Sequence, residues 1–237
     1  MGHMATTRDG NNKSTIMMFA ICENESNASW SFFADCGRRF GAQKYFDLDK
    51  SVIIHDRMKG IQRFHERFQK AVSIWCFDHL ARNVYTHIGG RKKLPKTLLW
   101  ACHREETHNL WFLELQKICK ISQKAADYLF NLNPREKAFQ YARLELGIQT
   151  RGHSTTGVQE GMNGNLKTEG IRYEAPLQFC EQVIMKMGKQ FAERQVESSK
   201  WDVVLHPLTP YAQRLWDEQV CICVRHQCFF KLFPFNR

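Results

Sequence analysis

Ser51-Val-Ile-Ile-His-Asp-Arg-Met-Lys-Gly60 is the stretch of sequence from which the fold can be predicted. Val52, Ile53 and Ile54 form a β-branched run that is too short for a helix and suits a buried strand of a parallel sheet. Asp56 follows at the carboxyl end of this strand, where open α/β sheets place ligands and catalytic groups. Two interpretations are open: the Asp56 carboxylate caps the next helix, or it holds a metal ion.

Further elements of an α/β fold surround this strand. The Asp-Gly and Asn-Asn pairs within 8–12 predict a turn, and the apolar runs 15–22 and 71–77 predict two more strands. The first four residues are typical of a cloning remnant and are left out of the prediction. Two helices, one opening at 27–30 and one following Asp56, would turn apolar stripes to the core: Trp30, Phe33 and Phe40 in the first, and Ile61, Phe64, His65 and Phe68 in the second.

From residue 80 onward the pattern changes to successive helices with short breaks between them. Helices are predicted at 79–87, 95–103, 107–120, 122–132 and 134–144, with a loop following at 147–158. A last long helix is predicted at 176–196. Its heptad-like apolar seam should pack against another helix or the sheet, and consists of Leu177, Cys180, Ile184, Met187 and Phe191.

The composition favours a polyanionic partner. The 237 residues are 43% hydrophobic, enough for a real core, and carry a formal charge of +10 with a pI of about 9.2. Such a balance favours nucleic acid over a membrane, and no apolar run reaches the length of a membrane span. The candidate DNA-binding residues are Arg91, Lys92, Lys93, Lys96, Lys117, Lys120 and Lys124.

The nine cysteines are scattered and odd in number, so we expect reduced thiols and a nuclear or cytosolic location. A secreted effector that acts inside host cells fits the same composition.

Cys76 and His79 have the spacing of half a zinc site, which would need two more ligands from Cys102, His103 or His108; packing with a hydrogen bond is the alternative. The apolar C-terminal segment is read either as a docking tail or as a second zinc site, formed by Cys221, Cys223, His226 and Cys228.

Four blocks of the sequence, in this order, resemble the catalytic domain of Mutator-like (MULE) transposases. They are Arg8-Asp-Gly-Asn-Asn12 with Ala20–Glu25 and Ser29–Phe33, Ile53-Ile-His-Asp-Arg-Met-Lys-Gly60, Cys76-Phe-Asp-His79-Leu-Ala-Arg-Asn83, and Thr155-Thr-Gly-Val-Gln-Glu160-Gly-Met-Asn163. The resemblance spans about residues 8–212. Gly157 departs from it, because asparagine is common there in the family.

The resemblance implies a metal-dependent mechanism on DNA. Such enzymes hold two Mg²⁺ or Mn²⁺ ions between two aspartates and a glutamate, and attack a DNA phosphate in line. Asp56 and Glu160 would be the catalytic and metal-binding residues carried by this chain; without the resemblance, Glu160 would be read as a solvated glutamate at a helix start. The family's first aspartate lies on an opening strand upstream of the Arg8–Asn12 block, and no residue here takes its place.

The expected fold is therefore α/β and helix-rich, with an incomplete ribonuclease-H-like sheet and a large all-helical insertion. The missing strand would be the central one, which leaves strand edges for another segment or a second copy to fill. Four regions are expected: a ribonuclease-H-like sheet region lacking its first strand (5–79), the helical insertion (80–146), the return to the catalytic core with Glu160 and the long helix (147–212), and an apolar, cysteine-rich tail (213–237).

Three hypotheses follow for the function. In the first, the chain is a transposase-derived domain that binds DNA but has lost strand cleavage and transfer. In the second, it is a non-catalytic regulator or effector that binds a host or nuclear protein. In the third, a second chain, as in a homodimer, supplies the absent ligand and the nuclease stays active. The first is the leading hypothesis.

Overall fold

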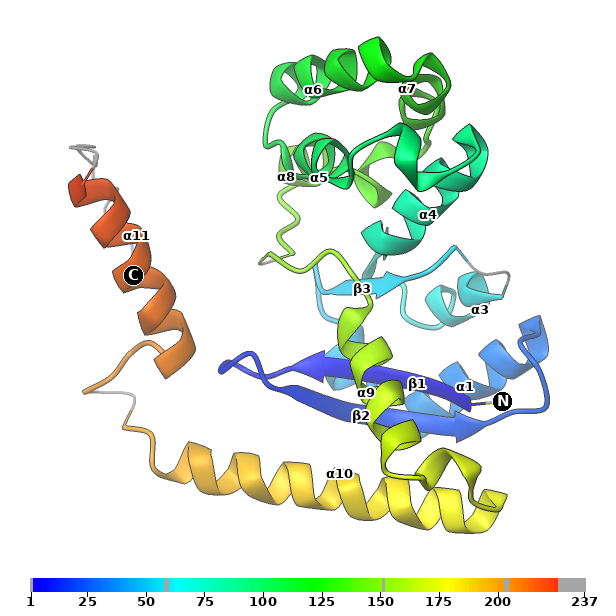
Figure 1. The fold of residues 1–237 in the computed structure, drawn as a ribbon. Coiled ribbons are helices and arrows are strands. Elements are labelled where there is room, and N and C mark those ends of the chain that lie inside the picture. The colour runs from blue at the N-terminus through cyan, green and yellow to red at the C-terminus, as the bar shows by residue number, and fades with distance from the viewer. Residues whose placement is uncertain (1, 58–59, 151, 203–204, 226–237) are drawn as a thin grey trace. The chain divides into compact units, whose positions relative to one another are not determined.

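The computed structural model describes residues 2–57, 60–150, 152–202 and 205–225 (Figure 1). The chain divides into two compact units, one formed by residues 1–4 and 18–160 and the other by residues 5–17 and 161–237. Helices predominate and the strands are few, which confirms a helix-rich α/β chain. Within the described residues, no helix combines the length and the apolar character needed to cross a membrane.

The first two strands form a hairpin, β1 (Gly2–Arg8) and β2 (Ser14–Ile21). The predicted turn lies between them, where the Asp9 amide donates to the Lys13 carbonyl and the Asn12 amide to the Asp9 carbonyl. Leaving the first four residues out of the fold was wrong, because β1 begins at Gly2. His3 is buried, stacks on Trp30 at 4.2 Å and lies 3.0 Å from the Ser29 hydroxyl.

Helices α1 (Asn27–Arg39), α2 (Gln43–Phe46) and α3 (Ile61–His65) surround a cluster of aromatic rings. Ser26 and Ser29 form a capping box that starts α1 where the sequence predicted. Phe33, Phe64 and Phe68 are buried as expected, although α3 itself is short. The prediction for Phe40 was wrong: α1 ends at Arg39, so the Phe40 side chain leaves the helical stripe and is 85% exposed.

Strands β3 (Val52–His55) and β4 (Val72–Trp75) pair in parallel, which confirms the strands predicted at 52–54 and within 71–77. Val52 is level with Val72, and His55 with Trp75. Among the described residues these strands form a two-stranded sheet of their own, separate from the β1–β2 hairpin.

The helical region packs around one apolar core that includes Trp111, Leu80, Leu99 and Phe139. Its elements are α4 (Phe77–Ile88), η1 (Arg91–Lys93), α5 (Lys96–Arg104), α6 (His108–Ile121), α7 (Gln123–Phe130), η2 (Arg135–Lys137) and α8 (Gln140–Glu145). The first four predicted helices are present. The fifth, expected at 134–144, is broken, because Phe139 has an extended backbone and turns its buried ring onto Trp111 at 5.3 Å.

The second unit is dominated by α10 (Pro176–Ser199), preceded by most of α9 (Gly157–Thr168) and by η3 (Ile171–Tyr173), and followed by α11 (Pro210–Arg225). The predicted packing of the apolar seam of α10 was wrong for Leu177 and Ile184. Leu177 is 72% and Ile184 59% exposed, whereas the buried side chain of α10 is Val183. The packed face is instead partly polar, because it binds the hairpin turn.

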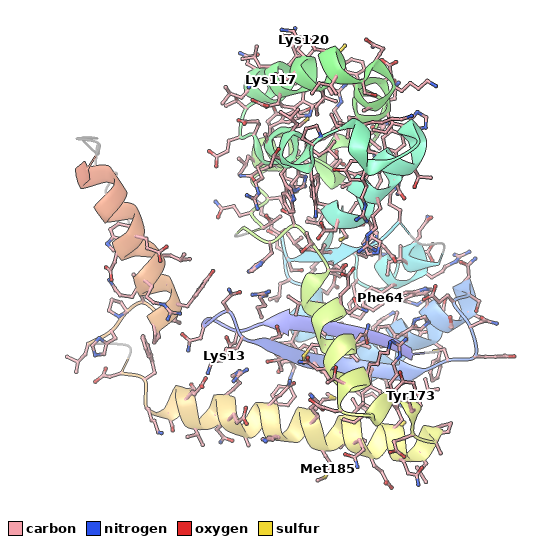
Figure 2. The ribbon with its side chains drawn as sticks, viewed as in Figure 1. Lys13, Phe64, Lys117, Lys120, Tyr173 and Met185 are labelled. Carbon is pink, nitrogen blue, oxygen red and sulfur yellow. The ribbon has the colours of Figure 1, made fainter. Side chains whose placement is uncertain are left out.

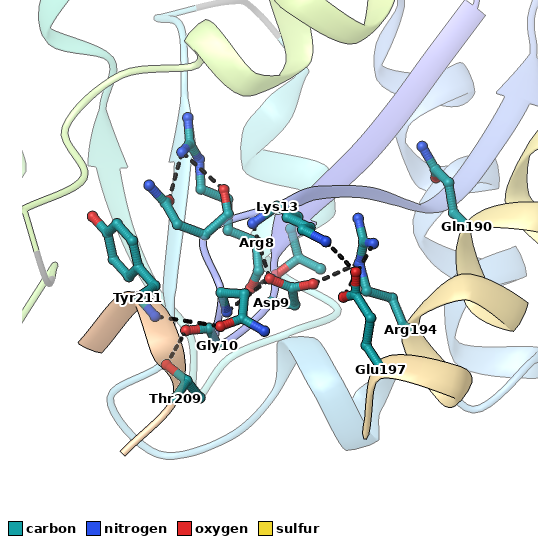
Figure 3. A network of polar contacts seen from close by, with 12 residues as sticks. Arg8, Asp9, Gly10, Lys13, Gln190, Arg194, Glu197, Thr209 and Tyr211 are labelled. Atoms are coloured by element: carbon teal, nitrogen blue, oxygen red, sulfur yellow. Dashed lines mark hydrogen bonds and ion pairs between the residues drawn. The ribbon is translucent and has the colours of Figure 1, made fainter. Parts of the chain in front are cut away.

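Residues 8–13 form the turn of the hairpin and are held by a network of polar contacts (Figure 3). The Asp9 carboxylate accepts the backbone amides of Asn11 and Lys13, both at 2.9 Å, and pairs with Arg194 of α10 at 2.5 Å. The Thr209 hydroxyl donates to the Gly10 carbonyl at 2.6 Å, just before α11. Asp9 therefore organises the turn and its contact with α10, and Gly10 connects the turn to the residue before α11.

Candidate functional site

The site begins at the carboxyl ends of β3 and β4. Because the strands are parallel and in register, the residues that follow them, Asp56 and Cys76, lie at the same edge of the sheet. The Cys76 amide donates to the His55 carbonyl at 2.6 Å, which extends the ladder up to Asp56. This is the edge at which the sequence predicted a functional carboxylate.

Asp56 does not cap the next helix. Helix α3 begins only at Ile61, its cap position is held by Gly60 at φ 95°, and no described side chain caps it. Gly60 is required there, because an added Cβ would lie 2.6 Å from Cδ1 of Trp30. Of the two interpretations of Asp56, the cap is therefore wrong, and the half-exposed carboxylate is left at the end of the strand.

Cys76 ties the segment before α9 to the end of β4. Its buried Sγ accepts two hydrogen bonds from Thr156, one from the amide and one from the hydroxyl, both 3.3 Å long. The Phe77 amide donates to the Ser154 carbonyl at 2.8 Å. These bonds fix the start of α9, and the Glu160 amide bonds the Thr156 carbonyl at 3.0 Å. Glu160 therefore stands in the first turn of a helix that is anchored on β4.

The Glu160 carboxylate faces two basic side chains of α4. Its Oε1 atom lies 3.9 Å from Nε2 of His79 and 3.8 Å from Nη2 of Arg82. The Glu160 and Arg82 side chains are about half exposed, so solvent screens the interaction. His79 Nδ1 is buried and has no hydrogen-bond partner among the described residues. The structure thus brings Glu160 to the Cys76–His79 block.

Asp56 and Glu160 come from opposite sides of the helical region in the sequence. Cys76 bonds to His55, the residue before Asp56, and to Thr156, one helical turn before Glu160. Within the described residues, however, no three His, Cys, Asp or Glu side chains are grouped so as to hold a metal ion. The Cys76 sulfur already accepts two hydrogen bonds. Of the further zinc ligands considered, His103 donates from Nδ1 to the Ala138 carbonyl, and burial raises the pKa of Cys102 to about 12. The side chains of Cys221, Cys223, His226 and Cys228 lie outside the described residues.

A buried histidine pair supports the strand that carries Asp56. His55 Nδ1 donates to the Asp56 carbonyl, so its Nε2 accepts the Ser73 hydroxyl at 2.6 Å. The His65 ring lies 5.1 Å from that of His55, and both of its nitrogens lack partners among the described residues. Burial lowers the pKa of His55, and burial with the nearby His55 and Lys137 lowers that of His65 to about 3. Both rings are therefore neutral at pH 7.

The candidate DNA-binding residues fall into two groups. Arg91 and Lys96 line a cleft beside α4, with Lys93 exposed on the connecting turn. Lys117 and Lys120 lie exposed on the outer side of α6, with Lys124 exposed at the start of α7 (Figure 2). The side chain of Lys92 lies outside the described part.

Sequence reasoning missed Thr156 and Arg82 as parts of the site. The available signal for Arg82 was its spacing, because Cys76, His79 and Arg82 follow one another at intervals of three residues along α4 and its cap. Thr156 carried no comparable signal, since its role depends on a contact formed 80 residues away in the sequence. Comparisons with models of protein families and with curated proteins found no match to this chain.

Proposed function

We propose that this chain is a MULE-transposase-derived DNA-binding domain whose metal-dependent site for strand cleavage and transfer is degenerate. The observation that carries the proposal is the convergence on Cys76: the segments bearing Asp56 and Glu160 both bond to it at the end of the parallel strand pair. The sequence resemblance assigns its second and third catalytic carboxylates to these two residues. A shared ancestry requires the two carboxylates to lie near one sheet edge, and the bonds that join His55 and Thr156 to Cys76 support this arrangement.

The division of the sheet supports the same ancestry. The β1–β2 hairpin and the β3–β4 pair form separate two-stranded sheets among the described residues. The resemblance implies this division, because the family's first strand lies between the strands that correspond to these two pairs. The open edges of β1 and β3 would then be the positions that the central strand occupies in a complete ribonuclease-H-like sheet.

The electrostatics of Glu160 support a degenerate site. A carboxylate that binds Mg²⁺ or Mn²⁺ needs its oxygens free, whereas Glu160 faces the Arg82 guanidinium at 3.8 Å and His79 at 3.9 Å. The guanidinium already provides positive charge to this carboxylate, which lowers its affinity for a metal ion. With Glu160 paired in this way, we expect weak metal binding and no cleavage by the chain alone.

The formal charge of +10 and the exposed lysines of α6 and α7 support DNA as the partner. Among the described cysteines, five are free thiols, which supports a nuclear or cytosolic location: Cys36, Cys76, Cys102, Cys119 and Cys180.

The test combines duplex binding with nicking of supercoiled plasmid. We expect binding without added metal, an affinity that falls steeply between 50 and 200 mM salt, and no nicking in Mg²⁺ or Mn²⁺. Nicking that Asp56→Ala or Glu160→Ala abolishes would instead show an active nuclease, with the third carboxylate supplied by a second chain. Absent DNA binding at low salt would overturn the proposal.

A second candidate function, a non-catalytic protein that binds a host or nuclear protein, is favoured by α10. Its exposed face carries Leu177, Ile184 and Met185, which are 72%, 59% and 73% exposed. Replacement of these three residues by serine would abolish partner capture under this function and leave duplex binding unchanged under the first.

A further inference from the structure

A cleft of about 410 Å³ lies between α4 and the segment that leads into α5. Three cations line it, Arg82 from α4 and Arg91 and Lys96 from the following segment, together with one carboxylate, Asp78. Its volume is in the range of small-ligand sites. The excess of positive charge favours an anionic occupant.

Two glycines bring the cations together. Helix α4 ends at Gly89 with φ 78°, and Gly90 follows with φ 134°, a conformation that side-chain-bearing residues rarely adopt. The chain therefore reverses sharply, and Leu94, only 1% exposed, anchors the returning segment in the helical core. Arg91, on the returning segment, thereby lines the same cleft as Arg82 of α4.

The remaining walls suit a sugar or a base beside a phosphate. Ala81, Leu94 and Pro95 form the apolar part of the lining, of which Pro95 is exposed, and Tyr85 also lines the cleft. Burial raises the pKa of Tyr85, and the charges of Lys96 and Arg91 act in the opposite direction. A phosphate with an apolar group attached matches this combination.

The cations are accessible to a ligand. Lys96 is 54% exposed and pairs with Asp78 at 2.7 Å, and Arg82 is 51% exposed. Surface ion pairs of this kind are weak, so a phosphate can compete for both cations. Arg82 also connects the cleft to Glu160 at 3.8 Å.

We infer that this cleft holds one nucleotide of a nucleic-acid strand, with its phosphate on Arg82, Arg91 and Lys96 and its sugar or base against Pro95. The inference rests on the proposed DNA-binding function. It adds to that function a specific nucleotide contact next to Glu160. It also gives Arg91 and Lys96 a different role from the lysines of α6, which would contact DNA outside the cleft.

The experiment compares two double variants of the full chain, Arg91→Ala with Lys96→Ala and Lys117→Ala with Lys120→Ala. The pairs are matched: each removes two exposed cations, one of which pairs with a carboxylate, Asp78 for Lys96 and Glu114 for Lys117. Binding of AMP is followed by titration calorimetry, and binding of a labelled single-stranded oligonucleotide by fluorescence anisotropy at 50 mM salt. Thermal unfolding verifies that each variant folds, and Arg91→Glu serves as a second cleft variant.

We expect the cleft pair to lose at least about tenfold in affinity for AMP and for the oligonucleotide, because charge-assisted phosphate contacts are removed. The α6 pair should lose oligonucleotide affinity by a smaller factor and keep its affinity for AMP. Equal oligonucleotide affinities of the two double variants, with the AMP affinity of the cleft variant unchanged from wild type, would overturn the inference and leave the proposed function standing. AMP binding through the cleft without any oligonucleotide binding would overturn both.

Discussion

Thr156 donates two hydrogen bonds to Sγ of Cys76, one from its backbone amide and one from its hydroxyl, across 80 residues of sequence. Between these two residues lies the whole helical core region. The buried thiol is therefore the point at which the chain returns to the end of β4 before Glu160.

Replacing Cys76 by alanine should loosen this return. The variant would leave two donors of Thr156 without their acceptor, at a cost of about 2 kcal/mol in the free energy of unfolding. Amide exchange of residues 154–160 should accelerate. Cys119→Ala is the control, because that thiol donates to Gln123 and packs against the helical core, and amide exchange at 154–160 should match wild type. Unchanged exchange in the Cys76 variant would contradict the anchoring role.

Gly60 combines a left-handed backbone with a close contact to Trp30. Gly41 has the left-handed backbone without the contact, so a comparison of the two measures each effect. Both have positive φ, 95° and 77°, but only at Gly60 would a Cβ meet Trp30, at 2.6 Å. We expect Gly41→Ala to cost about 1 kcal/mol and Gly60→Ala about 3 kcal/mol. Urea unfolding of the two variants measures the difference. Equal costs would show that Trp30 does not press on this turn.

Stability should fall with acid over a defined range. Burial lowers the folded-state pKa of His55, and burial is the main cause that lowers those of His65 and His103 to about 3. In the unfolded chain these rings take up protons below about pH 6.5, so the stability that they contribute above that pH is lost in acid. For His65 and for His103 the loss is up to about 1.4 kcal/mol per pH unit between about 6.5 and 3.

Thermal unfolding from pH 7.5 to 4.5 measures this slope. His65→Phe should reduce the slope, because one buried ring that resists protonation is removed. The exposed His206 is the control, and His206→Phe should leave the slope unchanged. A steeper slope for His65→Phe would show that the buried His65 ring does not cause the loss of stability in acid.

Arg143 is a buried guanidinium in the helical core, 1% exposed, and burial lowers its pKa to about 10. Its Nε and Nη2 atoms lack partners among the described residues, although Nη1 donates to the Glu136 carbonyl at 3.4 Å. Arg143→Met removes the desolvated charge and keeps most of the packing, so it should stabilise the chain by about 1 kcal/mol. Arg143→Ala should destabilise it by about 2 kcal/mol through the cavity left. Destabilisation by methionine as well, in urea unfolding, would indicate that the charge has a partner.

The fold was predicted best where local chemistry decides the structure. The β-branched run at Val52 gave a strand, and Ser122 began a helix by accepting the Ala125 amide. Prediction failed where long-range packing decides, as at Phe139, which leaves a helical pattern to bury its ring on Trp111. It failed for α10 because Asp9 and Gln190 recruit a polar face of that helix to the hairpin.

The site shows the same limit. A carboxylate after a buried strand, as at Asp56, is visible in the sequence, because strand ends are recognisable and parallel pairing aligns them. The meeting of Glu160 with His79 and Arg82 depends on how the chain returns after the helical region, and no local pattern encodes this return.

Arg82 faces Glu160 and also lines the α4 cleft. A single guanidinium that serves both places makes them thermodynamically linked. An anion that attracts Arg82 into the cleft releases the Glu160 carboxylate, and a cation at Glu160 frees Arg82 for the anion. The two ligands would therefore promote each other's binding by the same factor, so that any residual affinity for metal would rise when a nucleic-acid strand is present.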